Sequence, residues 1–313
     1  MTRTTIALAC LAALAGSAIA VPKAYLASVD GNIYRLTPND TLELVSTVGQ
    51  APVAISAQED HLVVADSFGR VVRVDPTTGN LLATYQIWHG ISATAVTAAP
   101  NDQIFVADST GNISYLDANG SEIDTYYAGM QVSAMLVDEP NLIIGSPNTF
   151  ILSAPFGDPN FNFISACGGI VNSLVLTPTK LFAGDANGTV YRFDAAGGAY
   201  EATFPTATDA KGVALLNADL LVVGSNGTLE HLDPATGALI STVDLAVPVS
   251  GIIVADFPCA ADTSPDGLLN LDDVNTFAIA FASGDMSADL DASGALNLDD
   301  VQLFAAAFTN GCP

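Results

Sequence analysis

Two twelve-residue segments near the C-terminus carry oxygen-bearing side chains at matched positions. In each segment, positions 1, 3, 5, 9 and 12 are Asp, Ser or Asn, position 6 is Gly, and position 7 offers its backbone carbonyl. Positions 1, 3, 5, 7, 9 and 12 of the first segment are Asp262, Ser264, Asp266, Leu268, Asn270 and Asp273. Those of the second are Asp289, Asp291, Ser293, Ala295, Asn297 and Asp300. Calcium prefers six to eight oxygen ligands of these kinds, so the sequence predicts two Ca²⁺ sites.

The two loops are copies of one another, and each continues into the pattern Leu-Asp-Asp-Val-x-x-Phe-Ala-x-Ala-Phe. Apolar residues at this spacing form one face of a helix. The predicted face of the first helix is Leu271, Val274, Phe277, Ala278 and Phe281. That of the second is Leu298, Val301, Phe304, Ala305 and Phe308. We expect the two faces to pack together, and the duplication favours calcium loops over acidic turns that bind nothing.

The loops follow the EF-hand arrangement, with Asp in place of the usual terminal Glu. The duplicated loop–helix unit resembles a type I dockerin, and more closely the short dockerin-like domain that ends in Gly-Cys, here Gly311-Cys312. The resemblance implies a calcium-binding domain over residues 259–313, with the residues above as ligands and a cohesin-like or cell-surface protein as partner. Positions 10 and 11, which carry cohesin recognition in dockerins, are Leu-Asp in both loops rather than small hydroxyl residues.

The rest of the chain is built from six similar segments. The residue after the first strand of each segment is Ser28, Asp66, Asp108, Ser146, Asp185 or Ser225, and successive copies lie 38, 42, 38, 39 and 40 residues apart. Each copy combines an apolar run, a tight turn, an alternating strand, a second turn and a third strand, and a short apolar strand precedes it. Four strands in about 40 residues are typical of a propeller blade.

The sequence therefore predicts an all-β six-bladed β-propeller, followed by a small α-helical C-terminal domain of paired calcium loop–helix units. Residues 250–257 have no hairpin after them, and we expect them to supply the first strand of the blade that contains residues 23–48. This exchange would close the ring and cover its edge. An open β-solenoid, a sandwich and a seventh blade are the alternatives.

These repeats resemble quinoprotein-like (PQQ-like) and YVTN-type propeller repeats over most of residues 23–257. The resemblance implies the fold and leaves the function open. Because the chain has one tryptophan, Trp88, and no vicinal cysteine pair, a quinone cofactor is not expected.

Charge and the N-terminal segment predict an exported protein. With 8 Lys+Arg against 33 Asp+Glu, the net charge is −25, which argues against nucleic-acid or anionic-membrane partners. Residues 1–20 combine Arg3, an apolar stretch and Ala18-Ile19-Ala20, the features of a signal peptide cleaved after Ala20. The predicted domains are the signal peptide 1–20, the propeller 21–258 and the dockerin-like domain 259–313. We expect a secreted or cell-surface protein with no transmembrane segment after cleavage.

Cys259 and Cys312 bracket the C-terminal domain, and an oxidising compartment allows them to form a disulfide. Cys167 is then left as an unpaired thiol, which we expect to be buried.

No catalytic constellation stands out, although the question of an enzyme stays open. The histidines His61, His89 and His231 are scattered, while Asp66, Asp108 and Asp185 face the propeller channel or cap their turns. We expect a non-enzymatic binding or interaction protein, with the propeller as ligand-binding scaffold and the C-terminal domain as anchor. The alternative is a secreted hydrolase or lyase acting on polysaccharide or lactone. Acidic or His groups in the channel would favour the enzyme, whereas Ser, Thr and aliphatic residues would favour binding. The sequence does not name the ligand.

Overall fold

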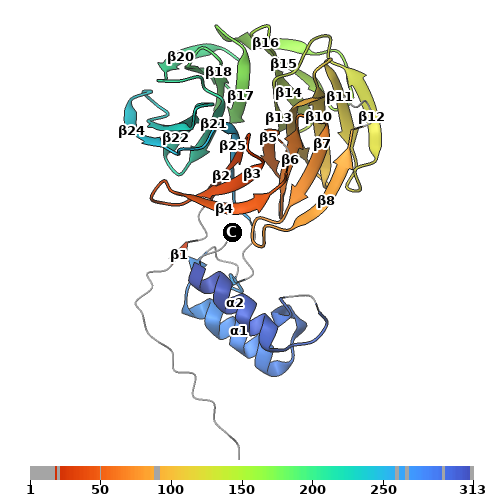
Figure 1. Cartoon of the computed structure of the whole chain (residues 1–313), viewed down its shortest axis with the longest axis vertical. Helices are drawn as coiled ribbons and strands as arrows, with labels where there is room; N and C mark the ends of the chain where they lie inside the picture. Colours follow the sequence, from red (N-terminus) through yellow and green to blue (C-terminus); the bar gives the residue numbers. More distant parts are fainter. Residues whose placement is uncertain are drawn as a thin grey trace, which may run out of the picture. The chain divides into compact units, whose positions relative to one another are not determined.

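The computed structural model describes residues 18–19, 22–49, 51–87, 92–257, 261–264, 268–290 and 293–310. Contacts divide the chain into two compact units, one of Pro22–Phe257 and one of Met1–Val21 with Pro258–Pro313. The larger unit contains six four-stranded antiparallel sheets (Figure 1). This confirms the predicted six-bladed propeller with a small helical C-terminal part.

The blades are numbered here along the chain from the one that contains both ends of the propeller. Blade 1 consists of β25 (Val249–Ala255), β2 (Lys23–Ser28), β3 (Asn32–Leu36) and β4 (Leu42–Thr47). Blade 2 contains β5 (Pro52–Ala57), β6 (Leu62–Asp66), β7 (Arg70–Val74) and β8 (Leu81–Gln86). Blade 3 contains β9 (Ala93–Ala99), β10 (Gln103–Asp108), β11 (Asn112–Leu116) and β12 (Glu122–Tyr127).

The other three blades repeat this order from the inside of the ring outward. Blade 4 contains β13 (Ala134–Asp138), β14 (Asn141–Gly145), β15 (Phe150–Pro155) and β16 (Asn162–Ala166). Blade 5 contains β17 (Val171–Leu176), β18 (Lys180–Asp185), β19 (Thr189–Asp194) and β20 (Tyr200–Pro205). Blade 6 contains β21 (Gly212–Leu216), β22 (Asp219–Val223), β23 (Thr228–Leu232) and β24 (Leu239–Asp244).

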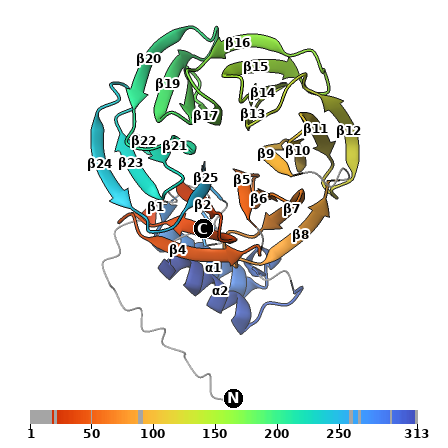
Figure 2. The ribbon, with the colours of Figure 1, turned by 45° about the horizontal axis from the view of Figure 1, so that its top comes forward.

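The ring closes as the sequence predicts, because β25 pairs with β2 in register from Lys23↔Ala255 to Ala27↔Gly251. The innermost strands of successive blades contact one another in the order β25, β5, β9, β13, β17, β21 and back to β25. Figure 2 shows these six strands around the centre of the ring. They are the elements that line the channel.

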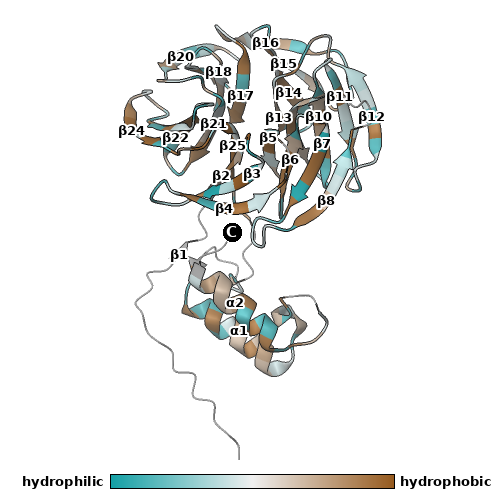
Figure 3. Cartoon of the chain, in the orientation of Figure 1, coloured by the Kyte–Doolittle hydropathy of each residue, from teal (hydrophilic) through white to brown (hydrophobic). Residues whose placement is uncertain are grey.

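The propeller has its core between blades rather than at its centre. Six hydrophobic clusters each join two neighbouring blades, and the cluster that packs Leu26 of blade 1 against Leu221 of blade 6 completes the circle. The burial follows the position in each blade: all residues of β6 are buried, whereas most of β8 is exposed. In Figure 3 the inner strands are correspondingly brown and the outer strands are mixed. Packing between blades therefore fixes the innermost strands in place.

The smaller unit contains the short pair β1 (Ala18–Ile19) and β26 (Leu268–Leu269), then α1 (Leu271–Ser283), η1 (Met286–Ala288) and α2 (Leu298–Asn310). The two long helices pack through the rings of Phe277 and Phe304, which stack with their centroids 4.2 Å apart. Both helices begin with two aspartates in the first turn, where carboxylates favour the helix dipole. Cleavage after Ala20 would remove β1, and β26 would lose this partner.

One part of the predicted helix faces is wrong. Leu271 and Leu298 are 71% and 66% exposed, and Ala278 and Ala305 are also exposed. The cap residue Asn270, four positions before Val274, lies above Val274 on the same side of the helix. Leu271 follows Asn270 by one position, which turns its side chain by about 100° away from the buried face. Ala280 and Ala307 pack against the cluster instead. None of the described helices combines the length and hydropathy needed to cross a membrane.

Candidate functional site

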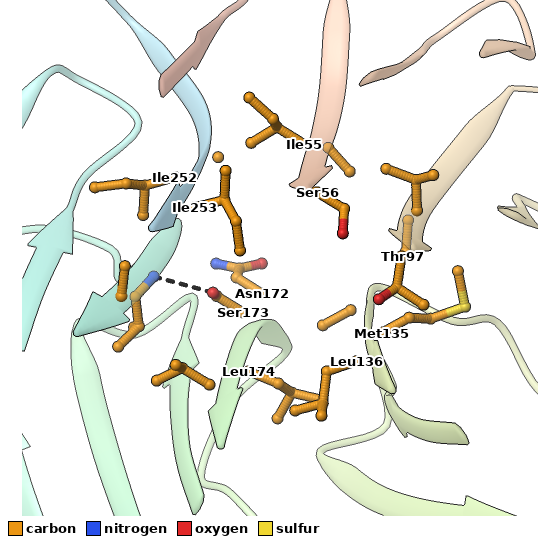
Figure 4. Close-up of a pocket in the computed structure, with 18 of the residues that line it drawn as sticks. Ile55, Ser56, Thr97, Met135, Leu136, Asn172, Ser173, Leu174, Ile252 and Ile253 are labelled. Atoms are coloured by element: carbon orange, nitrogen blue, oxygen red, sulfur yellow. Dashed lines mark hydrogen bonds between the residues drawn. The ribbon is translucent and has the colours of Figure 1, made fainter. Parts of the chain in front are cut away.

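A cavity of about 410 Å³ lies among the innermost strands, and all six blades contribute to its wall. Figure 4 shows side chains from these strands converging on it, including Ile55, Met135, Leu174 and Ile252. Small-molecule sites in proteins have volumes of about 300–1,000 Å³ and mostly apolar walls. The propeller channel has both properties.

The hydroxyl groups of the lining are largely engaged in holding blades together. Ser56 Oγ accepts a hydrogen bond from the backbone N–H of Ala98 in the next blade at 3.0 Å. Ser173 Oγ accepts one from the N–H of Val213 at 2.9 Å, the dashed line in Figure 4. Ser133 Oγ donates to the carbonyl oxygen of Val171 at 2.5 Å, again in the next blade. These hydroxyls fix the spacing of the innermost strands.

Two polar side chains of the lining remain available to a ligand. The amide of Asn172 points into the cavity (Figure 4) and makes no hydrogen bond to another group in the described ranges. Lys211, just before β21, is half-buried, and it is the charged residue among the described residues of the wall. Burial lowers the pKa of the Lys211 ammonium, and the nearby carboxylate of Asp209 opposes this effect only in part. Neither residue belongs to a motif that is recognisable in the sequence.

The three aspartates that could have faced the channel cap their turns instead. Asp108 Oδ1 accepts hydrogen bonds from the N–H groups of Thr110 at 2.8 Å and Asn112 at 3.1 Å. Asp66 and Asp185 accept the same pair of bonds in their own blades. Burial alone would raise the pKa of Asp108, but the hydrogen bonds from Thr110 and Asn112 outweigh it and hold that pKa below its usual range. Among the described residues that line the channel, none is Asp, Glu, His or Cys.

The described histidines lie away from the channel. His231 Nδ1 is 3.1 Å from Asp219 Oδ2, and its Nε2 is 3.2 Å from Asp40 Oδ1 in the neighbouring blade. Asp60, His61 and Asp102 form a group whose potential ligand atoms lie within 4.8 Å of one another. Only the register between blades 2 and 3 brings Asp102 to this group, so no spacing in the sequence signals it. His89 lies outside the described residues.

Cys167 is buried and free, as the sequence predicts. Burial raises the pKa of its thiol to about 12, and the charge of Asp185 adds to this shift. Such a thiol is protonated and unreactive at neutral pH. The predicted partners Cys259 and Cys312 lie outside the described residues, so their disulfide stays a prediction.

In the first C-terminal loop, the position-12 carboxylate gathers the other candidate ligands. Asp273 Oδ1 accepts hydrogen bonds from the N–H and the hydroxyl of Ser264 at 3.0 and 2.9 Å. Its Oδ2 accepts one from the N–H of Asn270 at 2.8 Å, which completes a capping box at the start of α1. Asp262, Ser264 and Asn270 are half-buried, Leu268 contributes its backbone to β26, and Asp266 lies outside the described residues.

The second loop repeats this arrangement. Asp300 Oδ2 accepts a hydrogen bond from the N–H of Asn297 at 2.8 Å, and Asp289 Oδ2 accepts one from the N–H of Gly294 at 2.8 Å. Gly294 has φ of +81°, the left-handed conformation that position 6 requires. Asp289 Oδ1 also accepts from the N–H of Ser293 at 3.1 Å. Ala295 offers its carbonyl at position 7, while Asp291 lies outside the described residues.

The described candidate ligands of both loops offer the oxygen atoms that a calcium ion prefers. Asp273 and Asp300 are fully buried, and a buried carboxylate is stabilised by hydrogen bonds or by a bound cation. Although burial opposes it, hydrogen bonds from Asn270 and Ser264 hold the pKa of Asp273 below its usual range, so the carboxylate is ionised at neutral pH. A carboxylate oxygen has more than one lone pair, so these hydrogen bonds leave room for a cation.

Comparison with models of protein families found no match, and a search of curated proteins found none either. The resemblances to quinoprotein-like and YVTN-type repeats and to dockerins therefore stay predictions. Among solved structures, 1793 chains match. One of them, a chain from the crystal structure of a nidogen/laminin complex, has a TM-score of 0.65 and 16% sequence identity, and the match covers 75% of this chain and 98% of that one. At this identity the likeness establishes the propeller fold alone.

Proposed function

We propose that this chain is a secreted, non-enzymatic binding protein whose propeller channel holds a small ligand or a ligand side chain. The observation that carries the proposal is the channel wall, which is mostly aliphatic, with hydroxyls engaged between blades, the amide of Asn172 and the single charge of Lys211, and which lacks Asp, Glu, His and Cys among its described residues. Hydrolases and lyases need a positioned acid or base at the reacting atoms. The three aspartates that could have served are used in capping turns.

The propeller match supports a binding role in a second way. One solved chain that shares the fold comes from the crystal structure of a nidogen/laminin complex, which supports a propeller that acts as a protein-binding scaffold. Rigid blades around a fixed channel suit a scaffold, because a preorganised site loses little conformational freedom on binding.

The channel is tested by filling it. Met135→Trp places a large ring in the lining, and Leu82→Trp on the exposed strand β8 is the matched control. A screen of small amphiphiles by thermal shift and calorimetry is expected to give binders at one per chain. Met135→Trp should abolish this binding while Leu82→Trp retains it, with circular dichroism confirming the fold of both. Turnover of glycoside, ester or lactone substrates, lost in Met135→Trp, would overturn the non-enzymatic proposal.

The C-terminal loops complete the proposal as two Ca²⁺ sites that stabilise an anchor. Two copies of one oxygen-rich loop, each with a buried position-12 carboxylate, support it. An acidic exported domain of this kind suits a cell-surface or cohesin-like protein partner, and the predicted signal peptide supports secretion.

Calorimetric titration of the full chain after chelator treatment tests the two ions. We expect two binding events in the wild type. Each single variant, Asp273→Asn or Asp300→Asn, should keep one event, and the double variant should show none. Asp285→Asn, in the same unit but outside both loops, is the control and should keep both events. Calcium should also raise the melting temperature with the logarithm of its concentration. Two events in the double variant would show that the ligands are wrongly assigned.

A further inference from the structure

Six equivalent positions with small residues form one ring around the channel, and a lysine stands directly before one of them. In five blades, the innermost-strand residue opposite the last residue before the turn is Ala54, Ala95, Ala134, Ser173 or Gly251. In blade 6 the equivalent pair is Gly212 with Val223, because Gly224 begins the turn as Ser146 does in blade 4. Lys211 directly precedes Gly212, in the place that Asn172 takes in blade 5. Lys211, Asn172 and the small residues of the other five blades line the cavity. The repeat therefore places a small residue at this position six times, and a long cation stands beside the ring in blade 6.

The charge of Lys211 has no close partner in the described ranges. The carboxylate of Asp209 is the one that raises the pKa of Lys211. However, Asp209 Oδ1 accepts hydrogen bonds from the N–H and the hydroxyl of Ser225 at 2.9 and 3.0 Å. Other basic residues form ion pairs: Arg35 with Glu43, Arg70 with Asp66, and both Lys180 and Arg192 with Glu201. With 33 acidic residues in the chain, the channel lysine is nevertheless left without a carboxylate at ion-pairing distance.

A half-buried, unpaired cation is costly, because burial removes part of its hydration. An anionic group bound beside it would restore a charge-assisted hydrogen bond in a site of low dielectric constant. Lysine acts as a compact single charge, whereas a phosphate or sulfate is held best by the fork of an arginine. The other residues of the cavity wall supply aliphatic surface and the free amide of Asn172.

We propose that the channel binds a small organic monocarboxylate with an aliphatic body, whose carboxylate contacts Lys211 and whose body lies against the apolar wall. This inference rests on the proposed binding function of the channel. Asn172 donates a second hydrogen bond to the same carboxylate, and the uncharged hydroxyls keep their bonds between blades.

The test compares three probes that share one alkyl chain: octanoate, octanol and octylamine. Their binding to the full chain is measured by calorimetry in the wild type, in Lys211→Met and in Lys211→Arg. The matched control is Lys180→Met, which removes a lysine from blade 5 outside the channel. Octanoate is expected to bind the wild type best and to lose about tenfold or more in affinity in Lys211→Met, as for the loss of a charge-assisted hydrogen bond. Lys211→Arg should retain most of the wild-type affinity for octanoate, and Lys180→Met should bind octanoate as the wild type does.

The outcomes separate this inference from the proposed function. If octanoate and octanol bind alike, and alike in the wild type and Lys211→Met, the channel binds ligands but Lys211 does not select an anion, and the inference is wrong. Preference for octylamine would overturn it as well. If octanoate binds and Met135→Trp does not weaken it, the site lies outside the channel, and both the inference and the channel function are wrong. Failure of octanoate to bind the wild type also overturns the inference, while the wider amphiphile screen still decides the function.

Discussion

Asp66, Asp108 and Asp185 are buried to 98% or more of their surface, yet each remains compatible with a stable fold. A buried carboxylate is tolerated when hydrogen bonds replace its lost hydration. Two backbone N–H groups of the following turn do so in each blade. The sequence left open whether these side chains face the channel or the turn, because only the packing of the next blade decides which direction is free.

The turn of blade 3 should make the protein sensitive to acid. Because the folded pKa of Asp108 is lowered, its carboxylate contributes stability above the unfolded pKa of about 3.9. That contribution is lost as the pH falls through the folded pKa. We expect Asp108→Asn to lower the urea midpoint at pH 7, and this deficit should shrink as the pH is lowered to about 3.

Urea titrations of both proteins across this pH range measure the effect. Asp124→Asn on the exposed strand β12 provides the baseline for removing a carboxylate from the same blade. A deficit in Asp108→Asn that is constant with pH would contradict the assignment.

The candidate site residues were predictable to different degrees. The proposed loop ligands are chosen from spacing alone, because calcium loops are local in the sequence, and they stay a prediction. Lys211 had a detectable signal, because aligning the innermost strands puts it in the place of the uncharged Asn172 of blade 5, but its role depends on six strands meeting at one place. The group of Asp60, His61 and Asp102 had none, because it forms across two blades.

At the scale of the hairpins, one repeat is strained. The first turn of five blades contains a glycine with positive φ: Gly31, Gly69, Gly111, Gly188 and Gly227. Blade 4 has Thr149 at this position, with φ of +75°. A β-branched residue in the left-handed region is an outlier, because its Cβ crowds the backbone.

Replacing Thr149 by glycine should therefore stabilise the propeller. Relief of the left-handed conformation raises the free energy of unfolding by about 1–2 kcal/mol. The greater freedom of glycine in the unfolded chain lowers it by about 0.5–1 kcal/mol. We expect a net gain of about 1 kcal/mol in the free energy of unfolding, measured by urea titration.

The reverse exchange serves as the comparison for blade 4. Gly111→Thr places a Cβ 2.4 Å from the carbonyl oxygen of Met130, so it should lower the midpoint. Equal midpoints for Thr149→Gly and the wild type would show that the turn of blade 4 carries no strain.

The helices show where pattern reasoning is strong and where it fails. Their existence and their packing through Phe277 and Phe304 follow from the repeated apolar spacing. The exposed Leu271 and Leu298 were assigned to the buried face because the pattern begins with them. Each helix begins at this leucine, so no earlier helical turn extends the buried face to it.

For the molecule as a whole, the blade count and the closure by β25 could be predicted, because six spacings and one strand without a hairpin are visible in the sequence. The ligand could not be predicted, because the channel wall is assembled from short stretches of six distant segments. No single repeat contains enough of the wall to indicate its chemistry.

The overall charge predicts a response to salt. With a net charge of −25, acidic groups repel one another across the surface, and dissolved ions screen this repulsion. We expect the melting temperature to rise between about 10 mM and about 300 mM sodium chloride, as the Debye length falls from about 30 Å to below 10 Å.

This measurement needs chelator throughout, so that calcium binding does not contribute to the shift. Choline chloride should reproduce the rise, because screening depends on ionic strength rather than on the cation. A melting temperature that is flat or falls with sodium chloride would mean that the acidic groups are too far apart or too well paired to repel.

Lys23 and Ala255 are paired neighbours on β2 and β25, so the propeller unit starts and ends on adjacent strands of one sheet. A unit with such ends can be spliced into a surface loop of a host protein without opening its ring, because the host chain leaves and resumes at nearly the same point. The same adjacency allows identical units to be joined in series by short linkers. The scaffold is thus suited to transplantation, and its channel would travel with it intact.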